Sequence, residues 1–437
     1  MKLWDKGYTV NEKIDKFTIG KDRELDIYIA KYDVLGNLAQ SKMLAKVGLI
    51  STEESISLNN ALTDLLKEIN EGNFIIEEEF EDIHSKIEHY LTIKCGEAGK
   101  KIHTARSRND QVLTALLLFY KDYCKKLTQL VEDLFDVFIK KAEKHKADLL
   151  PGYTHFQAAM PSSFGLLFSA YAEQLILDLY LLEGVFKTID QNPLGSAAGF
   201  GTSFPIDRDF TTKELNFSNT LISSVGAQML RGKAEKALSF AIAQLAGTLS
   251  KFAYDMVLYN GQEFGFLKLP KEFTTGSSIM PHKKNPDVFE LIRAQCNKIQ
   301  ALPNSLILTI NNLPSGYHRD FQILKEILFE PIIQLLDVIE ITIHAVNNLE
   351  VVENKIDDPK YNNIYTVENI NQKIQSGVPF RDAYKEIGLQ VENNTFAPQK
   401  NFKTTHIGSI HNLALDRITA KLKQFKENSE IYNFLKG

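Results

Sequence analysis

Residues 113–138 read LTALLLFYKDYCKKLTQLVEDLFDVF, and this stretch decides the fold class. Its apolar residues recur at intervals of three or four positions, at Leu113, Leu116, Tyr120, Cys124, Leu127, Val131, Leu134 and Phe138. This period places the apolar side chains on one face of an α-helix of about 25 residues. A helix of that length with one apolar stripe is typical of a bundle, in which the stripe packs against neighbouring helices.

Other stretches predict further long helices. A second apolar stripe is made by Ala234, Leu238, Ala241, Leu245, Leu249, Phe252 and Met256. Residues 164–189, 288–310 and 324–346 have the same apolar character, and Pro331 predicts a kink in the last of them. Because few strand signals lie between these helices, we predict a mainly all-α fold with an elongated central bundle. The long apolar faces also suggest that subunits associate.

Composition divides the chain into three predicted domains, which is a reasonable number for 437 residues. Residues 1–105 hold shorter helical patterns interrupted by glycines, and residues 106–350 contain the long helices. Residues 351–437 begin with an acidic, asparagine-containing stretch and continue with shorter, more polar helices.

The bulk composition excludes several classes of protein. The chain is 44% hydrophobic and 24% charged, as is usual for a soluble globular protein. Its net charge of −5 provides no basic field for nucleic acid. The N-terminus has no apolar run of signal-peptide length, and the apolar string 113–120 is too short to span a bilayer. We therefore expect a cytoplasmic protein with no nucleic-acid or membrane partner.

The sequence has no pattern of a metal or disulfide site. His84 and His89 lack the spacing of a zinc motif, and the three cysteines are odd in number and far apart. The glycines of residues 195–201 do not lie between a strand and a helix, so a dinucleotide fold is improbable.

Residues 276–287, GSSIMPHKKNPD, combine a glycine-serine turn, two lysines and a helix-start signal. Asn285 suits the capping position, Pro286 the first helical position and Asp287 the first turn. The start of a helix carries free N–H groups and partial positive charge, so Ser277 and Lys283 just before it predict a receptor for a carboxylate. The alternative is a charged surface loop.

Two other stretches carry candidate chemistry. Residues 103–111, HTARSRNDQ, open the first long helix with two arginines, which can bind carboxylates with two parallel hydrogen bonds. The alternative is a solvated capping region. Residues 151–157, PGYTHFQ, place His155 in a polar turn between two helical stretches, where an imidazole can transfer protons near neutral pH. The alternative is a histidine with a purely structural hydrogen bond.

Residues 276–287 closely resemble the signature of the fumarase/aspartase superfamily, whose members release fumarate. Together with the strings at 104–111, 152–157 and 317–325, they make the chain similar to the argininosuccinate lyase family. The resemblance implies a three-domain, mainly all-α fold and a homotetramer in which each active site combines three chains. It also implies reversible elimination of argininosuccinate to L-arginine and fumarate, the last step of arginine biosynthesis, with no metal or organic cofactor.

The same resemblance implies residue roles. Ser277 matches the serine that abstracts the Cβ proton, and His155 matches the histidine of general acid–base catalysis. Lys283 matches a group that holds the developing carbanion, and Glu290 matches an acidic partner of the histidine. The implied substrate-binding residues are Arg106, Ser107, Arg108, Asn109, Thr154, Ser278, Asn285, Tyr317, Gln322 and Lys325.

Three positions depart from the family pattern. His282 replaces a glutamine and is reminiscent of the adenylosuccinate lyase and cycloisomerase branches, so another fumarate-releasing lyase is the alternative function. His318 stands where asparagine is frequent. Asp22 falls where a substrate-contacting serine is usual, which leaves open a modified argininosuccinate as substrate. A non-catalytic relative, as among lens crystallins, is a third possibility that the retention of Ser277, His155, Lys283 and Asn285 opposes.

Overall fold

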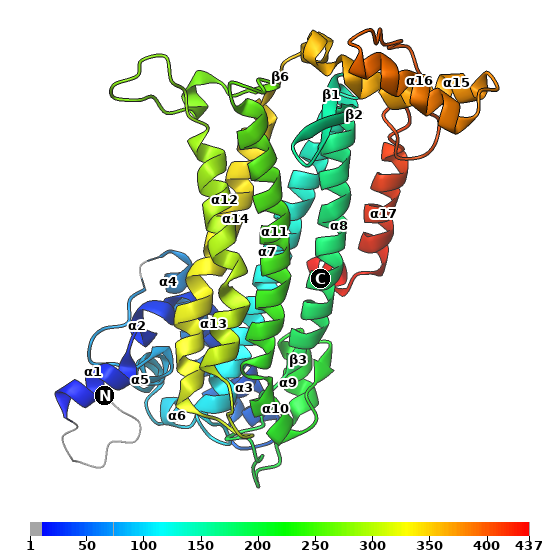
Figure 1. The fold of residues 1–437 in the computed structure, drawn as a ribbon. Coiled ribbons are helices and arrows are strands. Elements are labelled where there is room, and N and C mark those ends of the chain that lie inside the picture. Colours follow the sequence, from blue (N-terminus) through cyan, green and yellow to red (C-terminus); the bar gives the residue numbers. More distant parts are fainter. Residues whose placement is uncertain (1–10, 73, 437) are drawn as a thin grey trace.

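The long helices of the computed structural model, which describes residues 11–72 and 74–436, stand side by side as an elongated bundle (Figure 1). The bundle is formed by α7 (Arg108–Lys144), α8 (Phe164–Ile189), α11 (Lys233–Asn260), α12 (Asp287–Gln300), α13 (Leu302–Thr309) and α14 (Ile323–Asn348). Every residue of the two stripes predicted from the sequence is buried in its core. The predicted mainly all-α fold is therefore confirmed.

One predicted helix is wrong in detail. The stretch 288–310 is not continuous, because α12 ends at Gln300 and α13 begins at Leu302. Pro303, near the start of α13, has no N–H to continue the hydrogen-bond pattern of α12. By contrast, Pro331 lies inside α14, which remains one helix.

Shorter helices pack around the lower end of the bundle and precede it in the sequence. They are α1 (Glu12–Ile19), α2 (Asp22–Leu25), α3 (Ile27–Lys46), α4 (Thr52–Asn70), α5 (Ile83–Cys95) and α6 (Glu97–Lys100). Between α8 and α11 lie α9 (Arg208–Glu214) and α10 (Ser224–Leu230). The buried side chains of α3, α4 and α5 belong to the same apolar core as the bundle, so this part supports the bundle directly.

The last part of the chain leaves the bundle and returns to it. Four short 3₁₀ segments occur in the described chain, η1 (Lys271–Phe273), η2 (Arg319–Gln322), η3 (Lys355–Asp357) and η4 (Pro359–Tyr365). After η4, α15 (Thr366–Gln375) and α16 (Phe380–Glu392) enclose a small separate core. Then α17 (Leu415–Asn428) runs beside α8, and α18 (Glu430–Lys436) docks through Glu183, whose carboxylate accepts from the Glu430 N–H at 2.9 Å.

Strands are few and short in the described residues. They are β1 (Leu149–Thr154) with β2 (Gln157–Ser163), β3 (Gln191–Asn192) with β4 (Asn219–Thr220), and β5 (Leu267–Lys268) with β6 (Glu350–Val351). The first pair is an antiparallel hairpin that joins the end of α7 to the start of α8. Gly165 lets α8 start there, since a Cβ at this position would lie 2.6 Å from the Lys146 backbone.

Among the described residues, α8 is the helix that is long and apolar enough to cross a membrane by length and composition. More than half of its apolar window is buried inside the bundle. The core helix of a soluble protein has the same properties, so this helix by itself provides only weak support for a membrane span.

Candidate functional site

A polar pocket of about 230 Å³ lies at the lower end of the bundle, where α2, α5, α7 and the start of α14 meet. Its lining residues come from segments far apart in the sequence: Asp22, Asp26, Glu81, Asp82, His84, Arg108, Asn109, Val112, Arg231, Tyr317, Arg319, Gln322 and Lys325. The pocket thus brings together Arg108, Asn109, Tyr317, Gln322 and Lys325, which sequence resemblance had assigned to substrate binding.

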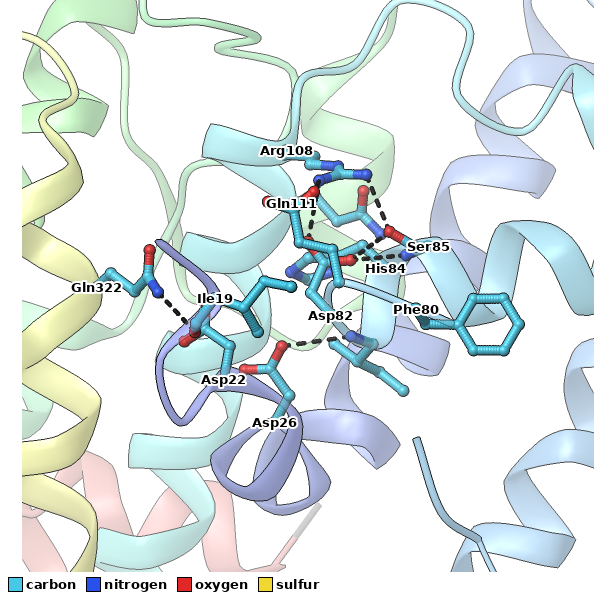
Figure 2. A network of polar contacts seen from close by, with 12 residues as sticks. Ile19, Asp22, Asp26, Phe80, Asp82, His84, Ser85, Arg108, Gln111 and Gln322 are labelled. Atoms are coloured by element: carbon cyan, nitrogen blue, oxygen red, sulfur yellow. Dashed lines mark hydrogen bonds and ion pairs between the residues drawn. The ribbon is translucent and has the colours of Figure 1, made fainter. Parts of the chain in front are cut away.

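Arg108 is held at the pocket wall by the start of α5 (Figure 2). Its Nη1 lies 3.1 Å from Asp82 Oδ2 and 3.3 Å from Glu81 Oε2, and its Nη2 donates to Ser85 Oγ at 2.9 Å. Asp82 also caps α5 by accepting from the Ser85 N–H at 2.8 Å. Although burial opposes it, the charges of His84 and Arg108 hold the pKa of Asp82 below its usual value. The guanidinium is therefore fixed in one orientation.

Lys325 forms the base of the pocket and is buried. Its Nζ lies 2.6 Å from Asp22 Oδ1 and 2.6 Å from Asp26 Oδ1. Burial opposes the charge, but Asp26 and Asp22 raise the pKa of Lys325 above its ordinary value, so the ammonium group stays charged. Burial also raises the pKa of Asp22 to about 6, with Lys325 acting in the opposite direction.

His84 supports the pocket from behind through a buried ion pair. Its Nδ1 lies 3.0 Å from Asp33 Oδ2, and Gln111 Nε2 donates to both Asp33 oxygens at 2.9 and 3.1 Å. Burial opposes protonation, but the Asp33 charge raises the pKa of His84. The sequence predicts no role for His84.

Other pocket residues were also missed from the sequence. They are Asp26, Glu81, Asp82, Val112, Arg231 and Arg319. The acidic string just before α5, ending in Asp82 at the capping position, is a helix-start signal that was available in the sequence. Arg231 and Arg319 have no comparable local signal, because only the packing of α11 and α14 brings them to the pocket.

Two residues of the 103–111 stretch lie outside the pocket lining. Arg106 is buried, and its Nη2 donates to Asn37 Oδ1 on α3 at 2.8 Å. Ser107 caps α7, with its Oγ accepting from the Asn109 N–H at 3.2 Å and its own N–H donating to Asp110 Oδ1 at 2.9 Å. In this chain both residues fix the start of α7, and Arg108 and Asn109 extend from it into the pocket.

The 276–286 loop lies at the opposite, upper end of the bundle, before α12 (Figure 1). Ser278 and Lys283 are exposed there, and Glu290 is exposed on the first turn of α12. Ser277 is partly exposed, and its Oγ accepts from the N–H groups of Met280 at 3.2 Å and Ile279 at 3.4 Å. Hydrogen bonds to an oxygen favour its anionic form, so this turn makes Ser277 a better candidate base than an ordinary serine.

The expected helix start at this loop is wrong by one residue. Pro286, not Asn285, occupies the capping position of α12, and no side chain caps that helix. Asn285 instead closes the loop, because its backbone pairs with Thr275 through N···O distances of 2.9 and 3.3 Å. Its side-chain amide also donates to Thr275 Oγ1 at 3.4 Å, which keeps it away from the helix N–H groups.

His155 lies in the two-residue turn between β1 and β2, also at the upper end of the bundle. His155 and Phe156 have φ angles of +53° and +58°, and they are exposed together with Thr154. Two consecutive residues other than glycine in the left-handed region cost about 1 kcal/mol or more each. A two-residue hairpin turn of this type requires positive φ at both central positions, and histidine adopts it more readily than most residues.

Within one chain the pocket is far from the loop and the hairpin. Arg108 stands at the start of α7, and this helix of 37 residues separates it from β1 and His155. At 1.5 Å per residue the helix is about 55 Å long. The structure therefore brings together five of the predicted residues at one end and leaves the Ser277 and His155 groups at the other.

Comparison with known proteins gives consistent results. A protein-family model described as lyase matches residues 10–301. The argininosuccinate lyase of Parabacteroides distasonis is 51% identical over 97% of this chain and 95% of its own length. That of Bacteroides fragilis is 50% identical, over 99% of this chain and 96% of its own length. A solved structure of EDDS lyase in complex with formate has a TM-score of 0.77 at 19% identity, covering 96% of this chain and 92% of the other.

Proposed function

The chain belongs to the argininosuccinate lyase family, and we propose on that basis that it cleaves argininosuccinate reversibly to L-arginine and fumarate. The observation that carries this function is the identity of about half of all residues over almost the whole of both chains. It is a carbon–nitrogen lyase, and its partner in the reaction is a small molecule. The last step of arginine biosynthesis is the corresponding cellular role.

The proposed chemical step is an elimination in which Ser277 is the base. Its Oγ, as the alkoxide, takes the Cβ proton of the succinyl group, and the electrons of that C–H bond form the double bond of fumarate. The bond from Cα to the guanidino nitrogen breaks, and this nitrogen gains a proton and departs with arginine. The two N–H groups at Ser277 Oγ support the alkoxide form.

Lys283 and Asn285 are proposed to hold the succinyl carboxylate as negative charge develops on it. Removal of one such donor commonly reduces the rate by about 10²–10³. His155, partnered by Glu290, is proposed for the proton transfers. Thr154 and Ser278 lie beside these groups and are proposed as substrate contacts.

Asn109, Tyr317, Gln322 and Lys325 are proposed to bind the arginine end of the substrate in the polar pocket. Arg108 forms the wall of this pocket. Arg106 and Ser107 support binding indirectly, since they fix the start of α7.

We also propose that the protein is a homotetramer whose active sites combine several chains. The pocket and the Ser277 loop lie at opposite ends of the bundle, so one chain by itself lacks a complete site. Packing of bundles in opposite directions would bring the two ends together. Large apolar side chains exposed on the bundle helices suit this contact: Leu177, Tyr180, Phe240, Tyr254, Leu291 and Leu308.

The direct test measures fumarate release by its ultraviolet absorbance. Argininosuccinate and adenylosuccinate are supplied as substrates in separate assays. We expect release from argininosuccinate only. Release from adenylosuccinate alone would assign the chain to another branch, as His282 had left open, and release from neither would support a non-catalytic relative.

A further inference from the structure

The charges of the polar pocket are balanced in a way that disfavours a simple anion site. Each lysine and arginine of the lining is already paired with at least one carboxylate: Arg108 with Glu81 and Asp82, Arg319 with Glu81, Arg231 with Glu235, and Lys325 with Asp22 and Asp26. A carboxylate that enters the pocket has to compete with these pairs. A group that carries a positive charge does not.

Asp22 is the carboxylate of the pocket best placed to receive such a group. Its Oδ1 contacts Lys325 Nζ at 2.6 Å, and its Oδ2 has no hydrogen-bond or ion-pair partner among residues 11–72 and 74–436. Its side chain retains 14% exposure, which is toward the pocket that it lines. Asp26, by comparison, is 1% exposed and uses its Oδ2 to accept from the Ile83 N–H at 3.3 Å.

Lys325 has one positive charge and two carboxylates at 2.6 Å, so this trio carries a net negative charge when both acids are ionised. Asp26 alone is sufficient to neutralise Lys325. The surplus negative charge of the trio is therefore that of Asp22.

We propose that Asp22 is a specificity-determining residue that binds the α-ammonium group of the arginine moiety and so selects substrates and products with a free α-amino group. The proposal rests on the function proposed above and concerns the opposite end of the substrate from the reacting carbon. An α-ammonium group donates charge-assisted hydrogen bonds to a carboxylate. Acylation of the α-nitrogen removes the charge and adds volume in a pocket of about 230 Å³.

The protonation state of Asp22 supports this role at neutral pH. Burial raises its pKa to about 6, so it is ionised above that value and able to attract a cation. The charged groups that face it are Lys325 on α14, Asp26 between α2 and α3, and Asp82 before α5, with His84, Glu81, Arg108, Arg231 and Arg319 in the remaining wall. Binding of an ammonium group favours the ionised form still further.

The experiment measures the affinities of L-arginine and Nα-acetyl-L-arginine for the assembled enzyme by isothermal titration calorimetry. We expect the wild type to prefer L-arginine by about tenfold or more, as for loss of one charge-assisted hydrogen bond. Asp22→Asn and Asp22→Ser should bring this ratio of affinities close to one, mainly by weakening the binding of L-arginine. The matched control is Glu24→Gln, which removes one exposed carboxylate from the same short helix outside the pocket and should keep the ratio.

Steady-state kinetics with argininosuccinate provide the second readout. Asp22→Asn should raise KM by about tenfold while kcat changes little, because the reacting groups are elsewhere. The proposal would be overturned if the wild type bound L-arginine and Nα-acetyl-L-arginine equally well. It would also be overturned if the Asp22→Asn variant kept the preference for L-arginine, or bound both ligands more weakly by the same factor. Failure of the lyase function is distinguishable, since it would appear as absent fumarate release by the wild type regardless of the binding ratio.

Discussion

Ser277, which we propose as the base, has a hydroxyl oxygen that its immediate neighbours favour as an anion. Its hydroxyl oxygen accepts two backbone N–H groups from the following residues, in a loop whose base is closed by Thr275 and Asn285. These donors stabilise negative charge on the oxygen before substrate arrives. Lys283, exposed in the same loop, adds a positive charge without a carboxylate partner among the described residues.

Ser277→Ala is expected to reduce turnover by at least 10²–10³, the usual consequence of losing a group that acts at the transition state. None of residues 276–286 belongs to the apolar cores of the described chain, so assembly should be unchanged. Fumarate release measures turnover, native mass spectrometry measures assembly, and titration with L-arginine measures binding. A variant with close to full rate and normal assembly would exclude Ser277 as the base.

The buried position of Asp22 leads to a second prediction, which concerns the stability of the folded protein. Its pKa is about 6 in the folded protein and 3.8 is its ordinary value, so the fold favours the protonated form. The stabilisation is therefore complete below about pH 4 and is lost as pH rises through about 6. At pH 7.5 the ionised carboxylate is unfavourable, and a functional role explains its presence.

Asp22→Asn is accordingly expected to raise the thermal midpoint at pH 7.5, with a smaller difference from wild type at pH 5. Differential scanning fluorimetry at both values measures this. A lower midpoint for the variant at pH 7.5 would mean that the pair with Lys325 is net stabilising.

At the scale of elements, the β1–β2 hairpin positions His155 by a turn with two left-handed residues. His155 and Phe156 are both exposed in this turn, which lies at the upper end of the bundle. A substitution here has to respect the backbone, because most side chains disfavour this conformation.

His155→Asn preserves that conformation, since asparagine tolerates positive φ better than most residues. It is expected to slow turnover by about 10²-fold, as for loss of an acid–base group, while the oligomer stays intact. Steady-state kinetics and native mass spectrometry test both parts. Dissociation into monomers would show that His155 has a structural role instead.

At the scale of the whole molecule, the length of α7 separates the pocket from the hairpin by about 55 Å. A site that combines the two, as we propose, needs more than one chain. We expect a mass in solution about four times 49.5 kDa.

The shared site can be tested with two slow variants, Ser277→Ala and Asn109→Ala, altered at opposite ends of the bundle. If one site takes its loop and its pocket from different chains, coexpression restores activity, because about a quarter of the sites in a random mixture contain both wild-type parts. Mixing the separately assembled proteins is the control. Activity no greater than the average of the two variants would place each site within one chain.

The sequence determined the fold class of this protein and the chemistry of its motifs. Apolar residues at spacings of three and four establish long helices without knowledge of their neighbours, as the burial of both stripes confirms. Motifs such as residues 276–287 identify the family because chemistry requires particular groups in a short segment. The helix break at Ala301 was missed although Pro303 was a local signal for it. The closure of the loop by Asn285 was missed because it depends on backbone pairing with Thr275.

Only the tertiary structure decided which of these groups share a pocket. Arg231 and Arg319 reach it through packing of α11 and α14, and the pairing of Lys325 with two carboxylates depends on contacts across some 300 residues of sequence. The excess charge at Asp22 could not be predicted from its residue type alone. Electrostatic balance depends on distance and burial, which sequence spacing does not determine for groups brought together by folding.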